Sequence, residues 1–148
     1  MRTTIIRDTF TVLLPLLALV AMPLQAQVNN YTSVTDARLN NPEPENWLSY
    51  RGNLEGWGYS SLDEINADNV SELQPVWTYS TGVVGGHESP PIVNNGVMFI
   101  TTPANELLAI DAASGDALWS YRHNLPDNLV AFHRTNRGVA LYGDRVFM

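Results

Sequence analysis

A repeated strand pattern constrains the fold of this chain more than any other feature. The pentapeptide VWTYS at residues 76–80 recurs as LWSYR at residues 118–122, and the two tryptophans lie 42 positions apart (119 minus 77). A hairpin pattern also recurs, first around residues 94–96 and then around residues 142–144. A four-stranded unit of about 40–50 residues is typical of a β-propeller blade, which must stack on a neighbour to cover its apolar face. We therefore expect an all-β chain, a partial β-propeller with one blade and the start of another.

Alternating apolar residues and turn residues predict the individual elements. The expected strands are residues 76–80, a hairpin over 91–101 that turns at 94–96, residues 106–110, residues 117–121, and a hairpin over 139–148 that turns at 143–144. One short helix is expected within residues 61–74, with Asn66 or Asp68 as its cap and Pro75 as its end.

The segment between the third and fourth expected strands has the pattern A-x-D-x-x-x-G-x-x-x-W over residues 109–119. Asp111 is placed to accept hydrogen bonds from backbone N–H groups of the turn, and Gly115 to adopt a positive φ. Trp119 supplies a flat aromatic group for stacking between blades. This pattern is similar to the tryptophan-docking motif of quinoprotein propellers. The alternative is an ordinary β-hairpin with a core tryptophan.

The first 26 residues have the composition of a secretory signal peptide. Arg2 and Arg7 give a positive start, residues 10–22 form an apolar run, and Ala26 offers a small residue at a cleavage point. An uncleaved membrane anchor is the alternative, although the run is shorter than the roughly 20 residues of a membrane span. We therefore expect a signal peptide at 1–26, an extended lead-in at 27–46 and propeller blades at 47–148, in the periplasm.

Charge and cysteine content exclude several classes of protein. The chain has 8 basic and 15 acidic side chains, a net charge of −7, and no lysine. An acidic surface without basic clusters argues against nucleic acid as a partner. The absence of cysteine excludes disulfides, thiolate metal sites and a lipid-modified cysteine. The three histidines lack metal-ligand spacing, so no metal site is expected within this chain.

The end of the sequence lies within an expected strand. Residues 146–148 (VFM) are apolar and belong to the second arm of the last hairpin. An open strand edge of this kind favours aggregation. We therefore expect the chain to be the amino-terminal fragment of a longer propeller, inactive alone.

The family resemblance rests on ordered motifs over residues 47–90. They are W-x-x-Y-x-G from Trp47, then Y-S-x-L from Tyr59, and finally the sequence TG at 81–82 and GHESP at 86–90. The order and spacing resemble the amino-terminal region of the pyrroloquinoline-quinone (PQQ) dependent methanol and ethanol dehydrogenases. The resemblance runs from about residue 34 to the end of the chain.

This resemblance implies an eight-bladed propeller that holds PQQ on its axis beside Ca²⁺ or a lanthanide. It implies oxidation of primary alcohols to aldehydes, with a c-type cytochrome as electron acceptor. The family's metal ligands and catalytic aspartate belong to later blades, so no catalytic residue is expected here. The oligomeric state stays open.

Two positions match PQQ contacts of the resembled family. They are Glu88 in the sequence GHE and Arg137 in the sequence NRG. A guanidinium fork suits the planar oxygen pairs of PQQ carboxylates and its ortho-quinone. From residue type alone, a solvated loop carboxylate and a surface arginine remain the alternatives.

One departure from the family lies six positions before this arginine. Many relatives have two adjacent cysteines that form a disulfide ring over PQQ, whereas this chain has Ala131 and Phe132. Phe132 or His133 are candidates to cover the quinone face instead. The absence of this cysteine pair argues against a close relationship to the methanol dehydrogenases. It is compatible with membership of the wider PQQ dehydrogenase family.

Two other functions fit parts of the sequence. One is a non-catalytic propeller scaffold for protein binding in the cell envelope, and the other is the product of a decayed gene. The scaffold is usually a lipoprotein, which the lack of cysteine disfavours, and it has no need of the motifs around Glu88 and Arg137.

Overall fold

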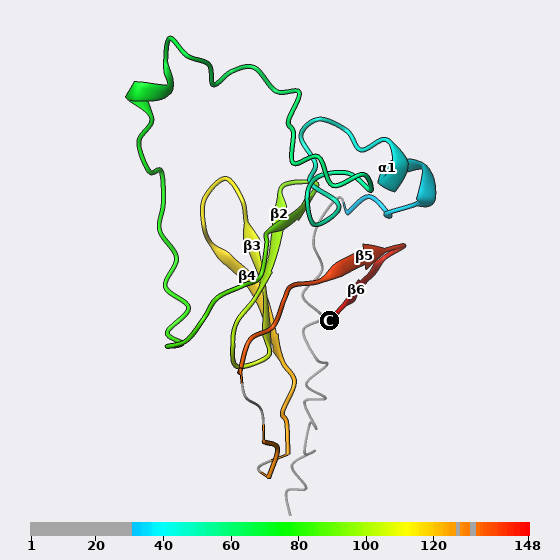
Figure 1. The fold of residues 1–148 in the computed structure, drawn as a ribbon, viewed down its shortest axis with the longest axis vertical. Helices are drawn as coiled ribbons and strands as arrows, with labels where there is room; N and C mark the ends of the chain where they lie inside the picture. Colours follow the sequence, from blue (N-terminus) through cyan, green and yellow to red (C-terminus); the bar gives the residue numbers. More distant parts are fainter. Residues whose placement is uncertain (1–30, 127, 131–132) are drawn as a thin grey trace, which may run out of the picture.

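The computed structural model describes residues 31–126, 128–130 and 133–148. Its largest element is a four-stranded antiparallel sheet with the strand order β1-β2-β3-β4 (Figure 1). Its strands are β1 (Ile92–Asn94), β2 (Val97–Thr101), β3 (Glu106–Asp111) and β4 (Ala117–Arg122). A second, two-stranded sheet consists of β5 (Ala140–Tyr142) and β6 (Arg145–Phe147). The prediction of a four-stranded blade followed by the start of another is thus confirmed.

Turn residues fix the register of the two predicted hairpins. Asn95 and Gly96 have φ of 51° and 75°, the conformation that a two-residue hairpin turn requires. This turn pairs Asn94 with Val97 and Ile92 with Phe99. Strands β5 and β6 pair in the same way around their own turn, at the position that the sequence predicted.

The core lies between one face of the sheet, the lead-in and the second hairpin. Val34 and Leu48 from the amino-terminal side join Phe99 of β2, Leu107 of β3 and Leu141 of β5 in one buried cluster. Backbone bonds add to it, because Val34 and Gly143 exchange N–H···O bonds of 2.9 and 2.7 Å. The lead-in therefore joins the blade to the start of the next one.

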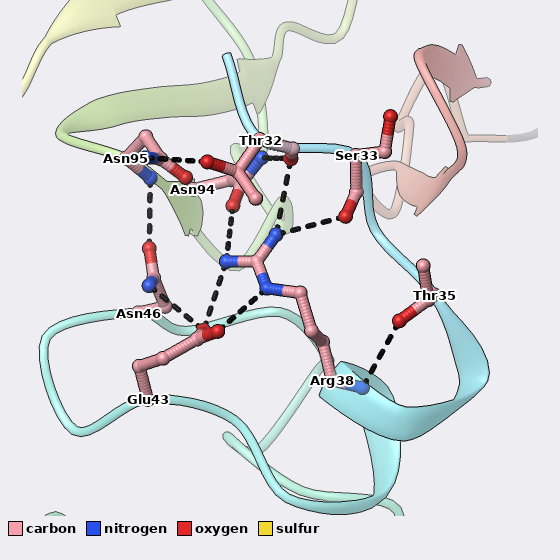
Figure 2. A network of polar contacts seen from close by, with 8 residues as sticks. All are labelled: Thr32, Ser33, Thr35, Arg38, Glu43, Asn46, Asn94 and Asn95. Carbon is pink, nitrogen blue, oxygen red and sulfur yellow. Dashed lines mark hydrogen bonds and ion pairs between the residues drawn. The ribbon is translucent and has the colours of Figure 1, made fainter. Parts of the chain in front are cut away.

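A polar cluster fastens the same lead-in to the first hairpin (Figure 2). The Arg38 guanidinium donates to both oxygens of Glu43 at 2.7 and 2.8 Å and to Asn94 Oδ1 at 2.9 Å. It also donates to the carbonyls of Thr32 and Ser33. We call these five residues the Arg38 cluster. Its Glu43 carboxylate has a pKa lowered to about 2, mainly by the hydrogen bonds from Arg38.

The turn between β3 and β4 receives a tryptophan from a distant part of the chain. Trp77 Nε1 donates to the Ala112 carbonyl at 3.1 Å. Gly115 has φ of 80°, and a Cβ placed there would lie 2.7 Å from the Trp77 ring. Asp111 accepts from two backbone N–H groups of the turn, and these bonds lower its pKa. The roles predicted for Asp111 and Gly115 are confirmed.

Trp119 packs against its own blade. Its ring lies 6.0 Å from that of Phe99, with the ring planes tilted by 54°. The side chain is partly buried against the core cluster that contains Leu141 of the second hairpin. Within the described residues it is thus Trp77 that docks on a turn of the pattern, while Trp119 packs against the core of its own blade.

Three expectations about local structure were wrong. Residues 76–80 form no strand, because no other described segment pairs with them and a strand needs a hydrogen-bonded neighbour. The helix expected within 61–74 is only one 3₁₀ turn, η1 (Val70–Glu72), whose N-cap is Asn69 rather than Asn66 or Asp68.

The lead-in, expected to be extended, contains helix α1 (Asp36–Asn40). Thr35 caps it, because its side chain accepts a hydrogen bond from the Arg38 backbone N–H. Arg38 lies on α1, so this short helix places the arginine within hydrogen-bonding distance of the first hairpin.

A long loop leaves the sheet and returns to it between residue 54 and β1 (Figure 1). Most of its large apolar side chains are exposed, and Trp57, Val76 and Val84 are 71%, 90% and 101% exposed. No helix among the described residues is long and apolar enough to span a membrane. The predicted signal peptide and Phe132 lie outside the described residues.

Candidate cofactor site

The structure brings Glu88 and Arg137 together from two separate loops. Glu88 precedes β1, and Arg137 precedes β5, 49 positions later in the chain (137 minus 88). Arg137 Nη2 lies 3.5 Å from Glu88 Oε2. Nothing in the sequence requires these two side chains to meet, so their contact is a result of the tertiary structure.

The two loops pack against each other on both sides of this pair. A Cβ placed on Gly138, which has φ of 103°, would lie 3.2 Å from Pro90 Cδ and 3.4 Å from Ser89 Oγ. On the other side, a Cβ placed on Gly86 would lie 3.5 Å from the Thr135 methyl group. The loops run alongside each other, and Glu88 and Arg137 are the middle residues of the contact.

The buried end of β2 is hydrogen-bonded to both loops. Thr101, the last residue of β2, is only 1% exposed. Its backbone N–H donates to Ser89 Oγ at 2.9 Å, and its hydroxyl donates to Asn136 Oδ1 at 2.8 Å. The neighbours of Glu88 and Arg137 in the chain are thus hydrogen-bonded to one buried residue.

The two charged side chains themselves are open to solvent. Arg137 is 83% exposed and Glu88 is 48% exposed, and a 3.5 Å separation is long for a charge-assisted hydrogen bond. Most of the N–H donors of the guanidinium remain available to a planar ligand. The arrangement suits a flat, oxygen-rich anion, which the guanidinium binds while Glu88 accepts from a donor or pairs with a cation.

His87 and His133 have different surroundings. His87 Nε2 lies 3.0 Å from Thr81 Oγ1, and its Nδ1 lies 3.1 Å from the Gly85 carbonyl oxygen, so its ring is held within its own loop. His133 is exposed and lines a cavity of about 610 Å³ together with Arg134 and Thr135. A Cβ placed on Gly86 would lie 3.5 Å from the Thr135 methyl group, so this cavity adjoins the loop of Glu88.

The described residues contain no group of three or more histidine, aspartate or glutamate side chains that could hold a metal ion. The chain has no cysteine.

Comparison with known proteins gives this geometry a context. The family model of the glucose/ethanol/alcohol dehydrogenase β-propeller domain, named PQQ, matches residues 47–146, more than half of the chain. The chain belongs to this PQQ dehydrogenase propeller family. Its sheet, its docking turn and the adjoining Glu88 and Arg137 loops all lie within the matched residues.

Curated relatives are quinoprotein alcohol dehydrogenases. The quinoprotein ethanol dehydrogenase of Pseudomonas aeruginosa is 43% identical over 103 residues, which cover 68% of this chain and 16% of that protein. The quinoprotein alcohol dehydrogenase PedH of Pseudomonas putida is 37% identical over 145 residues, which cover 95% of this chain and 24% of that protein. The chain thus spans less than a quarter of the length of these relatives.

Solved structures agree in fold. The quinohemoprotein alcohol dehydrogenase ADHIIG of Pseudomonas putida HK5 superposes with a TM-score of 0.71 at 31% identity, covering 80% of this chain and 18% of that one. A europium-containing methanol dehydrogenase superposes with a TM-score of 0.67 at 32% identity, covering 76% of this chain and 20% of that one. The chain therefore has part of the all-β propeller fold of this family.

The sequence patterns did not select the residues that hold the two loops of the candidate site. Ser89, Thr101 and Asn136 carry no chemistry that stands out in a sequence, and Thr101 lies within an apolar strand. A polar residue at a buried strand end was the available signal. Its meaning depends on the two loops that fold over it.

Proposed function

We propose that this chain forms the amino-terminal blades of a periplasmic PQQ- and metal-dependent dehydrogenase that oxidises primary alcohols to aldehydes. Family membership and the alcohol dehydrogenase relatives support this proposal. The observation that carries it to named residues is the meeting of Glu88 and Arg137 over a buried support.

In this proposal Arg137 binds paired oxygens of PQQ, and Glu88 contacts the cofactor from the adjoining loop. The exposed guanidinium and its loose 3.5 Å partner fit such a ligand, because few of its donors are already engaged. When bound, PQQ supplies the hydride acceptor for alcohol oxidation. The residues of this chain hold and orient the cofactor and do not act on the alcohol.

The remaining components come from outside the described residues. Ca²⁺ or a lanthanide bound by later blades would balance the charge of the cofactor, because the Glu88–Arg137 pair contributes no net charge. A c-type cytochrome is the expected electron acceptor. His133, at the cavity beside the Glu88 loop, and Phe132 remain the alternative candidates to cover the quinone face.

The test uses the whole gene product that carries this chain. After loading with PQQ and Ca²⁺ or a lanthanide, it should reduce an artificial dye with a primary alcohol, and omission of PQQ should abolish the reduction. The 148-residue chain alone should give no reduction. Equal dye reduction without PQQ would contradict the proposed function.

A signal peptide at residues 1–26 is tested separately. Expression of a fusion of these residues to a reporter protein that is active only in the periplasm should give reporter activity. Retention of the reporter in the cytoplasm would contradict periplasmic export. The alternative function, a protein-binding scaffold, predicts no PQQ binding by the whole gene product.

A further inference from the structure

We propose that Thr101 is a positioning residue, which sets the placement of Arg137 and Glu88 through bonds to their neighbours in the chain. The inference rests on the proposed function, because it assumes that these two side chains meet PQQ. It adds a residue that touches neither the cofactor nor the substrate.

The first support is that Thr101 makes a hydrogen bond to each of the two loops. Its backbone N–H donates to Ser89 Oγ at 2.9 Å, and its Oγ1 donates to Asn136 Oδ1 at 2.8 Å. Ser89 directly follows Glu88, and Asn136 directly precedes Arg137. One residue thus links the two loops from which the candidate cofactor contacts project.

The second support is that Asn136 is held on several sides. Its Oδ1 also accepts from the Gly138 backbone N–H at 3.0 Å, and its Nδ2 donates to Asn105 Oδ1 at 3.0 Å. The Gly138 bond fixes the backbone on the far side of Arg137. Rotation of the Asn136 side chain would therefore break three bonds and release the arginine loop.

The third support is the rigidity of the base. Thr101 pairs with Leu107 across β2 and β3, and the next residue, Thr102, donates its N–H to the Glu106 carbonyl at 2.8 Å. Thr101 and Thr102 are 1% and 0% exposed. Through Thr101 the loops are thus attached to the buried end of β2, a strand that is paired on both sides.

The consequence for binding follows from the exposure of the pair. Arg137 and Glu88 are too open for packing to hold them, so their preferred positions depend on the backbone beneath. A displacement of about 1 Å in a supporting element is enough to weaken a precisely oriented contact. Loss of the Thr101 hydroxyl should therefore weaken cofactor binding without removing any cofactor contact.

The experiment compares three variants of the whole gene product. Thr101→Val removes the hydroxyl and keeps the shape, Thr101→Ser keeps the hydroxyl, and Thr102→Val is the control at the adjacent buried threonine. PQQ affinity is measured by titration, and folding is checked by circular dichroism and urea unfolding. We expect Thr101→Val to weaken PQQ binding on the order of tenfold, with Thr101→Ser and Thr102→Val within about threefold of the unsubstituted protein.

A double-mutant cycle separates positioning from a general loss of structure. If Thr101 acts through Arg137, then Thr101→Val should have little further effect on PQQ affinity in an Arg137→Gln background. Equal effects in both backgrounds would overturn the inference for Arg137. Should Thr101→Val fail to fold, Ser89→Ala tests the Glu88 side, with Glu88→Gln as the paired background.

The outcomes distinguish the two proposals. Failure of the unsubstituted protein to bind PQQ contradicts the proposed function. Normal PQQ binding that Thr101→Val and Ser89→Ala leave unchanged contradicts the positioning role and leaves the proposed function intact.

Discussion

The Arg38–Glu43 pair and the Arg137–Glu88 pair consist of the same two residue types, but they differ in burial and in hydrogen bonding. In the Arg38 cluster the arginine side chain is 13% exposed, and all five N–H groups of its guanidinium donate to oxygens of the protein. In the Glu88–Arg137 pair the arginine side chain is 83% exposed, and its guanidinium has one oxygen of its partner at 3.5 Å. The Arg38 guanidinium has all its donors bound within the protein, whereas the Arg137 guanidinium has donors available for a ligand.

The difference follows from how each arginine reaches its partner. Arg38 lies on α1 beneath the hairpin turn, where two backbone carbonyls and Asn94 surround the head group. Arg137 projects from a loop whose hydrogen bonds belong to its neighbours, Asn136 and Gly138. Engaged donors indicate a stabilising role, and available donors on a supported backbone indicate a binding role.

The largest expected effect is loss of stability when the Arg38 cluster is opened. Arg38→Ala removes five hydrogen bonds to Glu43, Asn94 and two backbone carbonyls, so the free energy of unfolding should fall by about 3 kcal/mol. Urea unfolding monitored by circular dichroism measures it. Arg145→Ala is the control, because its pair with Asp144 is 3.9 Å long and both side chains are about 80% exposed. It should change the free energy by less than about 0.5 kcal/mol. Equal losses in the two variants would mean that the Arg38 cluster adds no stability.

Substitution of the open arginine should give the opposite pattern. Arg137→Gln removes the guanidinium and should weaken PQQ binding at least about tenfold, which corresponds to about 1.4 kcal/mol. The free energy of unfolding without PQQ should stay within about 0.5 kcal/mol, because the Arg137 side chain is exposed. Titration with PQQ and urea unfolding of the same variant provide both numbers. A destabilised variant with unchanged PQQ affinity would reverse the comparison.

A conservative substitution at both positions sharpens the comparison. Lysine keeps the charge but has no planar fork, so it satisfies only part of either arrangement. Arg38→Lys should lower the free energy of unfolding by about 1–2 kcal/mol, and Arg137→Lys should leave it unchanged while weakening PQQ binding severalfold. Unfolding and PQQ titration are carried out on both variants. Identical behaviour of the two lysine variants would show that charge alone matters at both sites.

The smallest expected effect concerns acid stability. The pKa of Glu43 is lowered from 4.5 to about 2, so its contribution to stability is fully present above pH 4.5 and is lost as the pH falls toward 2. Because this carboxylate is 40% exposed, the contribution should be below about 1 kcal/mol. Glu43→Gln should therefore lower stability at pH 6 and have a smaller effect at pH 3. Urea unfolding at both pH values measures it, with the exposed Glu55→Gln as the control. A Glu43→Gln effect that is the same at both pH values would rule out this linkage.

Elements that depend on neighbouring residues could be predicted from the sequence. The Asn-Gly turn, the docking turn from Asp111 to Gly115 and the strands β1 to β6 appear where local patterns placed them. The predictions that were wrong concern segments whose structure depends on distant parts of the chain. Residues 76–80 have the composition of a strand, but a strand exists only where another segment supplies hydrogen bonds, and none of the described segments does.

The candidate site was predictable only in part. Motif resemblance selected Glu88 and Arg137, and the structure places them in contact. It gave no reason to select Ser89, Thr101 or Asn136, because hydroxyl and amide side chains are common in loops and strand ends. Their role comes from hydrogen bonds between residues that are 12 and 35 positions apart.

The amino-acid sequence was enough to predict the repeat and the hairpin turns, because they depend on residue type and spacing, and its resemblance to a known family was enough to select Glu88 and Arg137. The tertiary structure alone decided that Glu88 meets Arg137, that Trp77 docks on Gly115, and that Arg38 is enclosed while Arg137 is open. The physical reason is that hydrogen bonds and burial between distant segments form only after the chain has folded. The same two residue types therefore form a stabilising cluster at Arg38 and a candidate cofactor site at Arg137.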